Sequence, residues 1–136
     1  MALILDTGPL VALLDATDPD HGRCAELIRD SNEHRMVPAC VLVEVEYMLR
    51  PWPKAFEALL AEFDAGSMEL LELPKQWLLR AGELLDRYRN LSLGLVDASV
   101  LAATEMLEET KLATLDHRHF LAVKPAHCEA LQLLPA

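Results

Sequence analysis

The 136-residue sequence predicts an α/β fold: a three-layer domain in which a short, mostly parallel sheet is flanked by helices. Two observations favour this class. Short apolar runs alternate along the chain with longer segments of helical periodicity, an order that requires crossover connections between parallel strands. Hydrophobic residues make up 52% of the chain, enough for a core of its own, and no repeat or linker divides it. We therefore expect one domain, residues 1–136.

The first strand and the first two helices are predicted from residues that begin or end an element as much as from hydropathy. Residues 2–5 are all apolar and predict a buried strand, which Asp-Thr-Gly-Pro then ends. Pro9 suits the first position of a helix over 9–16. The cluster TDPDHG predicts a turn, with Asp20 as the N-cap of a second helix over 21–31.

The next elements are a strand and two helices. Residues 34–39 predict a second strand. The segment 39–50 is rich in β-branched residues, yet its length and the preceding Pro38 favour a helix. Apolar residues at spacings of three and four predict an amphipathic helix over 51–65, and Gly66 stands just past its end.

The second half continues the alternation of strands and helices. Residues 67–74 predict a third strand, and 75–90 predict a helix with one apolar stripe. Residues 95–109 predict the last long helix. Residues 111–116 then form a fourth strand that ends in a carboxylate, and 130–134 a short fifth strand.

Composition excludes several classes of protein. A net charge of −10 and only 5% aromatic residues argue against binding nucleic acid by broad phosphate neutralisation or by base stacking. The three cysteines are widely spaced and lack a CxxC pair, which favours reduced thiols in a cytoplasmic protein over a disulfide framework. No apolar run is long enough to cross a membrane, and the N-terminus lacks the basic region of a signal peptide.

Four carboxylates interrupt apolar contexts near the end of a strand or the start of a helix. They are Asp6, Glu44, Asp97 and Asp116. Strands of a parallel sheet end at one edge, so Asp6 and Asp116 should open onto the same site. Clustered carboxylates repel one another unless a cation lies between them, and these hard oxygen ligands suit Mg²⁺ or Mn²⁺. Two such cations can activate water and stabilise the leaving oxygen in phosphodiester hydrolysis.

Each acid taken alone also has a simpler interpretation. Asp6 and Asp116 could cap a turn or helix, and Asp97 could favour a helix N-terminus through the macrodipole. Glu44 could lie on a helix surface, and so could Glu46, which falls roughly opposite it. The joint placement of the four acids is what favours a metal site.

Other chemistries find little support. The chain has no nucleotide-binding GxxxxGK[ST], no serine hydrolase GxSxG and no HExxH. Haloacid-dehalogenase-like phosphatases need a second aspartate two residues after Asp6, and receiver domains need adjacent acids there.

His117 and His119 flank Arg118 beside Asp116. We interpret this segment as a solvated loop, in which Arg118 is the better candidate for a phosphate contact.

Four segments of the chain, in order and at suitable intervals, resemble the motifs of the PIN-domain nucleases. Within that family they are most similar to the VapC-like toxins of bacterial and archaeal toxin–antitoxin pairs. The segments are LILDTGPLVALLD, VPACVLVEVEYML, LSLGLVDASVLAAT and KLATLDHRHF. The resemblance runs nearly end to end. Any one motif is a weak signal, but four in order are a specific one.

The resemblance assigns the role of metal ligand to the four acids, with the family glutamate at Glu44 rather than Glu46. It makes Thr7 and Thr114 neighbours of the ligands or contacts of a phosphate. Two departures concern detail. Gly94 and Leu95 precede the third motif's aspartate where many relatives carry a further acid. Pro-Ala-Cys opens the second motif, where relatives often have serine or threonine.

The resemblance implies a Mg²⁺- or Mn²⁺-dependent endoribonuclease that hydrolyses RNA phosphodiester bonds, and the toxin of a type II toxin–antitoxin pair. It also implies a homodimer, and a small antitoxin whose tail blocks the acidic pocket with a basic side chain. Two alternatives stay open. One is a catalytically inactive PIN-like protein-binding module, favoured by 12 Lys+Arg against 22 Asp+Glu. The other is an RNA-processing PIN nuclease without an antitoxin.

Overall fold

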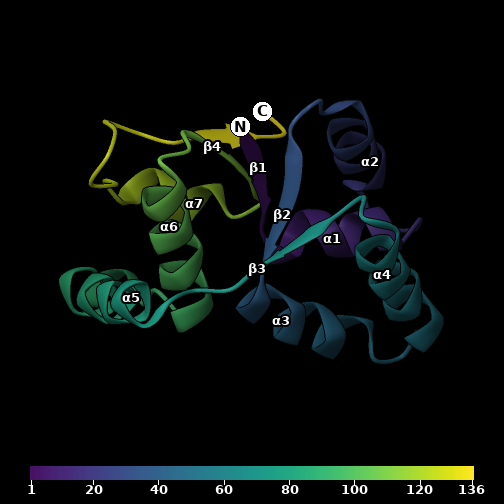
Figure 1. Ribbon diagram of the computed structural model, residues 1–136, viewed down its shortest axis with the longest axis horizontal. Coiled ribbons are helices and arrows are strands. Elements are labelled where there is room, and N and C mark those ends of the chain that lie inside the picture. The colour runs from purple at the N-terminus through teal and green to yellow at the C-terminus, as the bar shows by residue number, and fades with distance from the viewer.

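Five parallel strands form one sheet in the computed structural model, which describes residues 1–136 (Figure 1). The strands are β1 (Ala2–Leu5), β2 (His34–Pro38), β3 (Glu69–Leu71), β4 (Lys111–Ala113) and β5 (Gln132–Leu134). Their order across the sheet is β3-β2-β1-β4-β5, and each neighbouring pair is parallel. The chain builds outward from β1 first on one side and then on the other. The switch point of the strand order therefore lies between β1 and β4, where α/β sheets bind ligands.

Helices connect the strands and cover the sheet. They are α1 (Thr7–Leu14), α2 (His21–Asp30), α3 (Ala39–Leu49), α4 (Pro53–Ala65), α5 (Lys75–Arg87), α6 (Leu95–Leu107) and α7 (His117–Ala122), with a 3₁₀ turn, η1 (Arg89–Leu91), before α6. Figure 1 shows α1, α2 and α4 on one side of the sheet and α5, α6 and α7 on the other. The predicted α/β fold with a parallel, helix-flanked sheet is confirmed. None of the helices has the length and apolar character that crossing a bilayer would require.

The core lies around β1 and α6. All four residues of β1 are buried, as expected of a central strand covered on both faces. The α6 segment from Ala98 to Glu105 is buried as well, and its many alanines let this helix lie close to the sheet. At the other end of α6, Glu105 accepts two hydrogen bonds from Arg80 of α5, at 2.8 and 3.0 Å, and one from the Ala126 N–H at 2.7 Å. This ion pair ties α5 to α6.

The first helix begins at Thr7, two residues earlier than predicted. Pro9 is its third residue rather than its first, which costs no hydrogen bond because the first four N–H groups of a helix have no partner within it. Asp6 consequently occupies the N-cap position, with an extended backbone. Asp20 is the N-cap of α2 as predicted, but its carboxylate binds Arg23 instead of a backbone N–H.

A helix stands where the sequence predicts a loop. β4 ends at Ala113, earlier than predicted, and α7 begins at His117. The carboxylate of Asp116 accepts a hydrogen bond from the His119 N–H at 3.2 Å and so caps this helix. α7 has six residues, of which Phe120 alone is buried. A helix this short leaves no apolar periodicity in the sequence.

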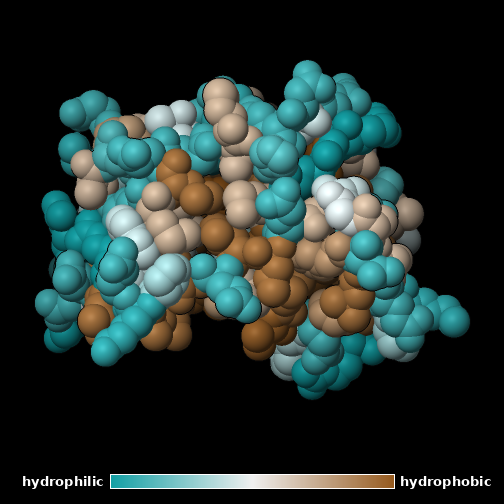
Figure 2. Space-filling model, in the orientation of Figure 1, coloured by the Kyte–Doolittle hydropathy of each residue, from teal (hydrophilic) through white to brown (hydrophobic).

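Large apolar side chains are exposed on α3 and α5. They are Val43, Tyr47 and Met48 on α3 and Leu78 and Leu79 on α5. Figure 2 shows apolar surface along the lower edge of the molecule, over the region where Figure 1 places these two helices, with a hollow between them. Exposed apolar groups gathered in this way are typical of surfaces that bind other proteins.

Candidate functional site

Asp6 stands at the switch point of the sheet. It follows β1, and its N–H donates to the Ala113 carbonyl of β4 at 2.9 Å, which extends the strand pairing up to the carboxylate. The hydroxyl of Thr114, the residue after β4, donates to Asp6 Oδ2 at 2.8 Å. Thr114 is fully buried and Asp6 is only 5% exposed. The adjacency of β1 and β4 thus places this carboxylate among the most buried polar groups of the protein.

Burial raises the pKa of Asp6 from its ordinary value of 3.8 to about 6. The hydrogen bonds from Thr114 and from the Thr7 N–H oppose this rise, because they stabilise the ionised form. The nearby carboxylates of Asp97 and Glu44 add to it. The charged neighbours acting on Asp6 are therefore both acidic, and no lysine or arginine of the chain compensates it.

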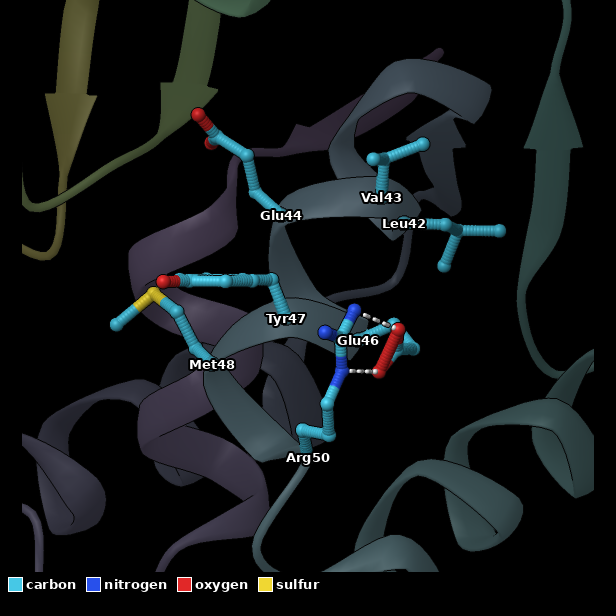
Figure 3. A pocket seen from close by; sticks show the side chains of 7 residues that line it. All are labelled: Leu42, Val43, Glu44, Glu46, Tyr47, Met48 and Arg50. Atoms are coloured by element: carbon cyan, nitrogen blue, oxygen red, sulfur yellow. Dashed lines mark hydrogen bonds and ion pairs between the residues drawn. The ribbon is translucent and has the colours of Figure 1, made fainter.

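Glu44 and Glu46 lie on different sides of α3. The Thr7 hydroxyl donates to Glu44 Oε1 at 2.6 Å, which ties this glutamate to the first turn of α1. Glu46 instead accepts two hydrogen bonds from Arg50, at 2.6 and 3.0 Å. Figure 3 shows the Glu44 carboxylate extending away from the Glu46–Arg50 pair. Residues two apart on a helix do not share a face, so only Glu44 can join the site around Asp6.

Asp97 and Asp116 complete the acidic cluster. Asp97 lies in the first turn of α6, after Gly94 at the N-cap. Single ligand atoms of Asp97, Asp116 and His119 lie within 4.8 Å of one another. Burial raises the pKa of Asp97, and the charges of Asp116 and Glu44 raise it further. These couplings link Asp97 to each of the other three predicted acids.

His119 is the side chain at this site that the sequence does not predict. Its Nδ1 lies 2.7 Å from Asp116 Oδ2, and its Nε2 lies 3.0 Å from the Leu91 carbonyl oxygen. Both partner atoms are oxygens, so both ring nitrogens are engaged in hydrogen bonds. The bond to Asp116 accordingly raises the pKa of His119 above its usual value. A histidine three residues after an aspartate at a helix start is the sequence signal that could have indicated this pair.

Arg118, the predicted phosphate contact, does not touch the acids. Its side chain is exposed and lines a hollow of about 390 Å³ together with Asn90, Ser92 and His119. Every other arginine donates to a carboxylate or a carbonyl or stacks on an aromatic ring. Arg118 alone has no such partner within the chain.

The atoms of this cluster that could bind a cation are all carboxylate oxygens. Four carboxylates supply oxygen atoms, two of them oriented by threonine hydroxyls, and the one nearby imidazole uses both nitrogens in hydrogen bonds. Hard oxygen donors without thiolate or free imidazole suit Mg²⁺ or Mn²⁺ rather than zinc or copper. The unneutralised charge around Asp6 fits a cation of this kind.

Comparison with known proteins agrees with the family resemblance of the sequence. The model of the PIN domain family matches residues 3–124. The ribonuclease VapC26 of Mycobacterium tuberculosis is 30% identical to the chain over 125 residues, which cover 90% of this chain and 93% of that protein.

Two solved structures share the fold at lower identity. The first is VapC20 of Mycobacterium tuberculosis, described as a toxin that cleaves the sarcin–ricin loop. It has a TM-score of 0.74 and 23% identity over 81% of this chain and 86% of that one. The second is a toxin–antitoxin complex from Klebsiella pneumoniae, with a TM-score of 0.69 and 16% identity over 89% and 92% of the two chains.

Proposed function

The chain belongs to the PIN-domain family, and on this premise we propose that it is a metal-dependent endoribonuclease, the toxin of a type II toxin–antitoxin pair. The ribonuclease VapC26 aligns with it over nearly the whole length of both chains. The observation that carries the proposal is the convergence of four carboxylates around Asp6, which is buried with acidic neighbours only. A bound cation would neutralise these buried charges, and carboxylates perturbed in this way are typical of functional sites.

Asp6, Glu44, Asp97 and Asp116 would hold one or two Mg²⁺ or Mn²⁺ ions. When bound, a divalent cation supplies Lewis acidity that lowers the pKa of water and neutralises charge on a phosphodiester. The chain's own contribution is to hold four oxygen donors ready at one edge of the sheet. Because the donors come from four separate segments, any substrate phosphate that reaches the cation is surrounded by fixed groups.

Thr114 and Thr7 orient the two innermost acids. The Thr114 hydroxyl donates to Asp6 and also accepts from the Asp116 N–H at 3.0 Å, so one buried group positions two of the ligands. The Thr7 hydroxyl donates to Glu44 and so positions a third ligand. Each hydroxyl leaves the remaining carboxylate oxygen free to bind a cation, which is what outer partners of metal ligands are expected to do.

We assign Arg118 to the RNA backbone. In a chain of net charge −10, most of the lysine and arginine side chains are already paired with acids. Arg118 lacks a partner and lines a hollow next to His119, so it can donate to a phosphate beside the one being cleaved. Arg118→Gln should weaken RNA binding more than it slows cleavage of bound RNA, which a separation of KM from kcat would reveal.

The protein partner is a small antitoxin. The likeness to a toxin–antitoxin complex supports this role. On α3, Val43, Tyr47 and Met48 are exposed beside Glu44, around a hollow of about 800 Å³ (Figure 3). An antitoxin segment that covers these apolar groups would bring a basic side chain within reach of the acids. The product of a short gene adjacent to this one should then co-purify with the chain and suppress cleavage.

Two further features complete the proposal. The chain forms a homodimer, for which the exposed Leu78 and Leu79 of α5 offer apolar contact surface. Sedimentation equilibrium should give twice the 15.2 kDa of one chain. The cytoplasm is its compartment, since all three cysteines are free thiols and its RNA substrate is found there.

Cleavage of labelled RNA by the purified chain tests the enzymatic proposal. Wild type should cleave with Mn²⁺ or Mg²⁺ and stop in EDTA. Asp97→Asn should lower the rate by at least about 100-fold, because loss of even an outer partner of a metal ligand costs about 10- to 100-fold. Asp64→Asn is the matched control, because Asp64 is exposed on α4 and far from the acids in sequence. Mn²⁺ binding by calorimetry gives an independent readout. A wild-type chain that neither binds Mn²⁺ nor cleaves RNA would establish the inactive binding module instead.

A further inference from the structure

The His119 side chain links two segments that each carry one of the acids. Its backbone N–H and its Nδ1 both bind the Asp116 carboxylate, at 3.2 and 2.7 Å. Its Nε2 binds the Leu91 carbonyl oxygen at 3.0 Å, 28 positions earlier in the chain. Leu91 is the last residue of η1, which leads into α6. The imidazole therefore bridges the start of α7 and the approach to α6.

This bridge holds the segment between η1 and α6, and that segment sets the position of Asp97. The chain passes from Leu91 through Ser92, in a left-handed conformation with φ 53°, to Gly94 at the N-cap of α6. Asp97 follows in the first turn of that helix. A shift of the Leu91 segment would therefore move Asp97 relative to Asp116. No hydrogen bond or ion pair joins the Asp97 and Asp116 side chains directly, so their spacing depends on the segments that carry them.

A direct role as a metal ligand does not fit the ring geometry. An imidazole binds a metal through a nitrogen lone pair, so the ligating nitrogen cannot carry hydrogen. Here Nδ1 faces a carboxylate oxygen and Nε2 faces a carbonyl oxygen, so both ring nitrogens already have a partner within the chain. The closeness of His119 to Asp97 and Asp116 thus reflects hydrogen bonding between the ring and its neighbours.

We propose that His119 is a positioning residue, which fixes the spacing of Asp97 and Asp116 for the cation without binding the cation itself. The inference rests on the proposed function for the presence of a divalent ion. It adds His119 to the two threonines that orient the acids and gives its side chain a role distinct from ligation. Outer partners of metal ligands typically change metal affinity by about 10- to 100-fold when removed.

Three substitutions separate the two ring contacts. The amide nitrogen of asparagine lies near the position of Nδ1, so His119→Asn keeps the contact with Asp116 and loses that with Leu91. The amide nitrogen of glutamine lies near Nε2, so His119→Gln keeps the opposite one. His119→Ala loses both. All three retain the backbone N–H that Asp116 caps, so the start of α7 is preserved.

Calorimetric Mn²⁺ titration and pulsed electron paramagnetic resonance of the Mn²⁺-loaded chain test the proposal. We expect His119→Ala to weaken Mn²⁺ binding by about 10-fold or more, with the asparagine and glutamine variants in between. We also expect wild type to show no modulation from a coordinated ¹⁴N nucleus. His34→Gln is the control, because His34 is exposed on β2 and pairs only with Glu69.

Each result decides one question. A coordinated nitrogen signal in wild type that disappears in His119→Ala would make His119 a ligand and overturn the positioning role. Equal Mn²⁺ affinity of wild type and His119→Ala would overturn it as well, while leaving the nuclease proposal intact. A wild-type chain that binds no Mn²⁺ would overturn both proposals together.

Discussion

Asp6→Asn should stabilise the metal-free protein near neutral pH, although it should abolish cleavage. Burial raises the pKa of Asp6 from 3.8 to about 6, so the folded state holds the proton more tightly than the unfolded chain. Stability is therefore highest below the lower value and falls as pH rises through the interval between the two. Above that interval the charged carboxylate costs the folded state about 3 kcal/mol, at about 1.4 kcal/mol for each pKa unit.

The hydrogen bond from Thr114 is already part of this balance, because it lowers the pKa below the value that burial alone would give. Asparagine is neutral like the protonated acid, so the variant avoids the charge penalty at every pH. The net gain for the variant is then about 3 kcal/mol at about pH 8, and about 1 kcal/mol at about pH 4.5, where only part of the charge penalty remains. For a chain of this length, 3 kcal/mol corresponds to a rise in Tm of roughly 12 °C.

Thermal unfolding in EDTA at both pH values measures the effect. Asp64→Asn is the control for loss of one surface charge, and it should track wild type at both pH values. Mn²⁺ at about 1,000 times its dissociation constant should reverse the order, because it stabilises wild type by about 4 kcal/mol and the variant much less. An advantage of the same size at both pH values, or none at about pH 8, would refute burial of an unneutralised charge.

Three further substitutions test separate contacts. Glu44→Gln should lower the rate of RNA cleavage by about 100-fold and Glu46→Gln should leave it nearly unchanged, whereas equal effects would mean that the wrong glutamate was assigned. Thr114→Val should destabilise the chain to urea by about 1–3 kcal/mol and weaken Mn²⁺ binding, because a buried carboxylate loses its donor, and Thr114→Ser should restore both. Glu105→Gln should cost about 3 kcal/mol in urea unfolding, since Arg80 loses its buried charged partner; a cost well under 1 kcal/mol would show that the pair is incidental.

The sheet and the position of the acids were predictable because they depend on local patterns. Alternation of apolar runs with helical segments predicts parallel strands, and parallel strands end at one edge whatever their order. Asp6 and Asp116 could therefore be placed together before the strand order was known. The residues that assist the acids were harder to predict. Thr7 and Thr114 owe their selection to the family resemblance, since a threonine near a strand end has no distinctive pattern of its own.

His119 shows why the remaining part of the site could not be predicted from the sequence. One of its two ring partners is the backbone carbonyl of Leu91, and a carbonyl group leaves no trace in a pattern of side chains. The other is Asp116, whose capping role depends on a six-residue helix too short for apolar periodicity. The early start of α1 has a similar cause, because Pro9 is acceptable at any of the first helical positions.

The hydrogen bond between Thr114 and Asp6 joins residues 108 positions apart. β4 must be synthesised before it can pair with β1, so Asp6 and Glu44 are made long before the strand that completes the site. A ribosome adds residues from the N-terminus at about 5–20 per second and conceals the newest part of the chain in its exit tunnel. The acidic centre is therefore assembled only after β4 has left the tunnel. A nascent chain still attached to the ribosome, itself largely RNA, carries the early acids without the arrangement that would let them act together.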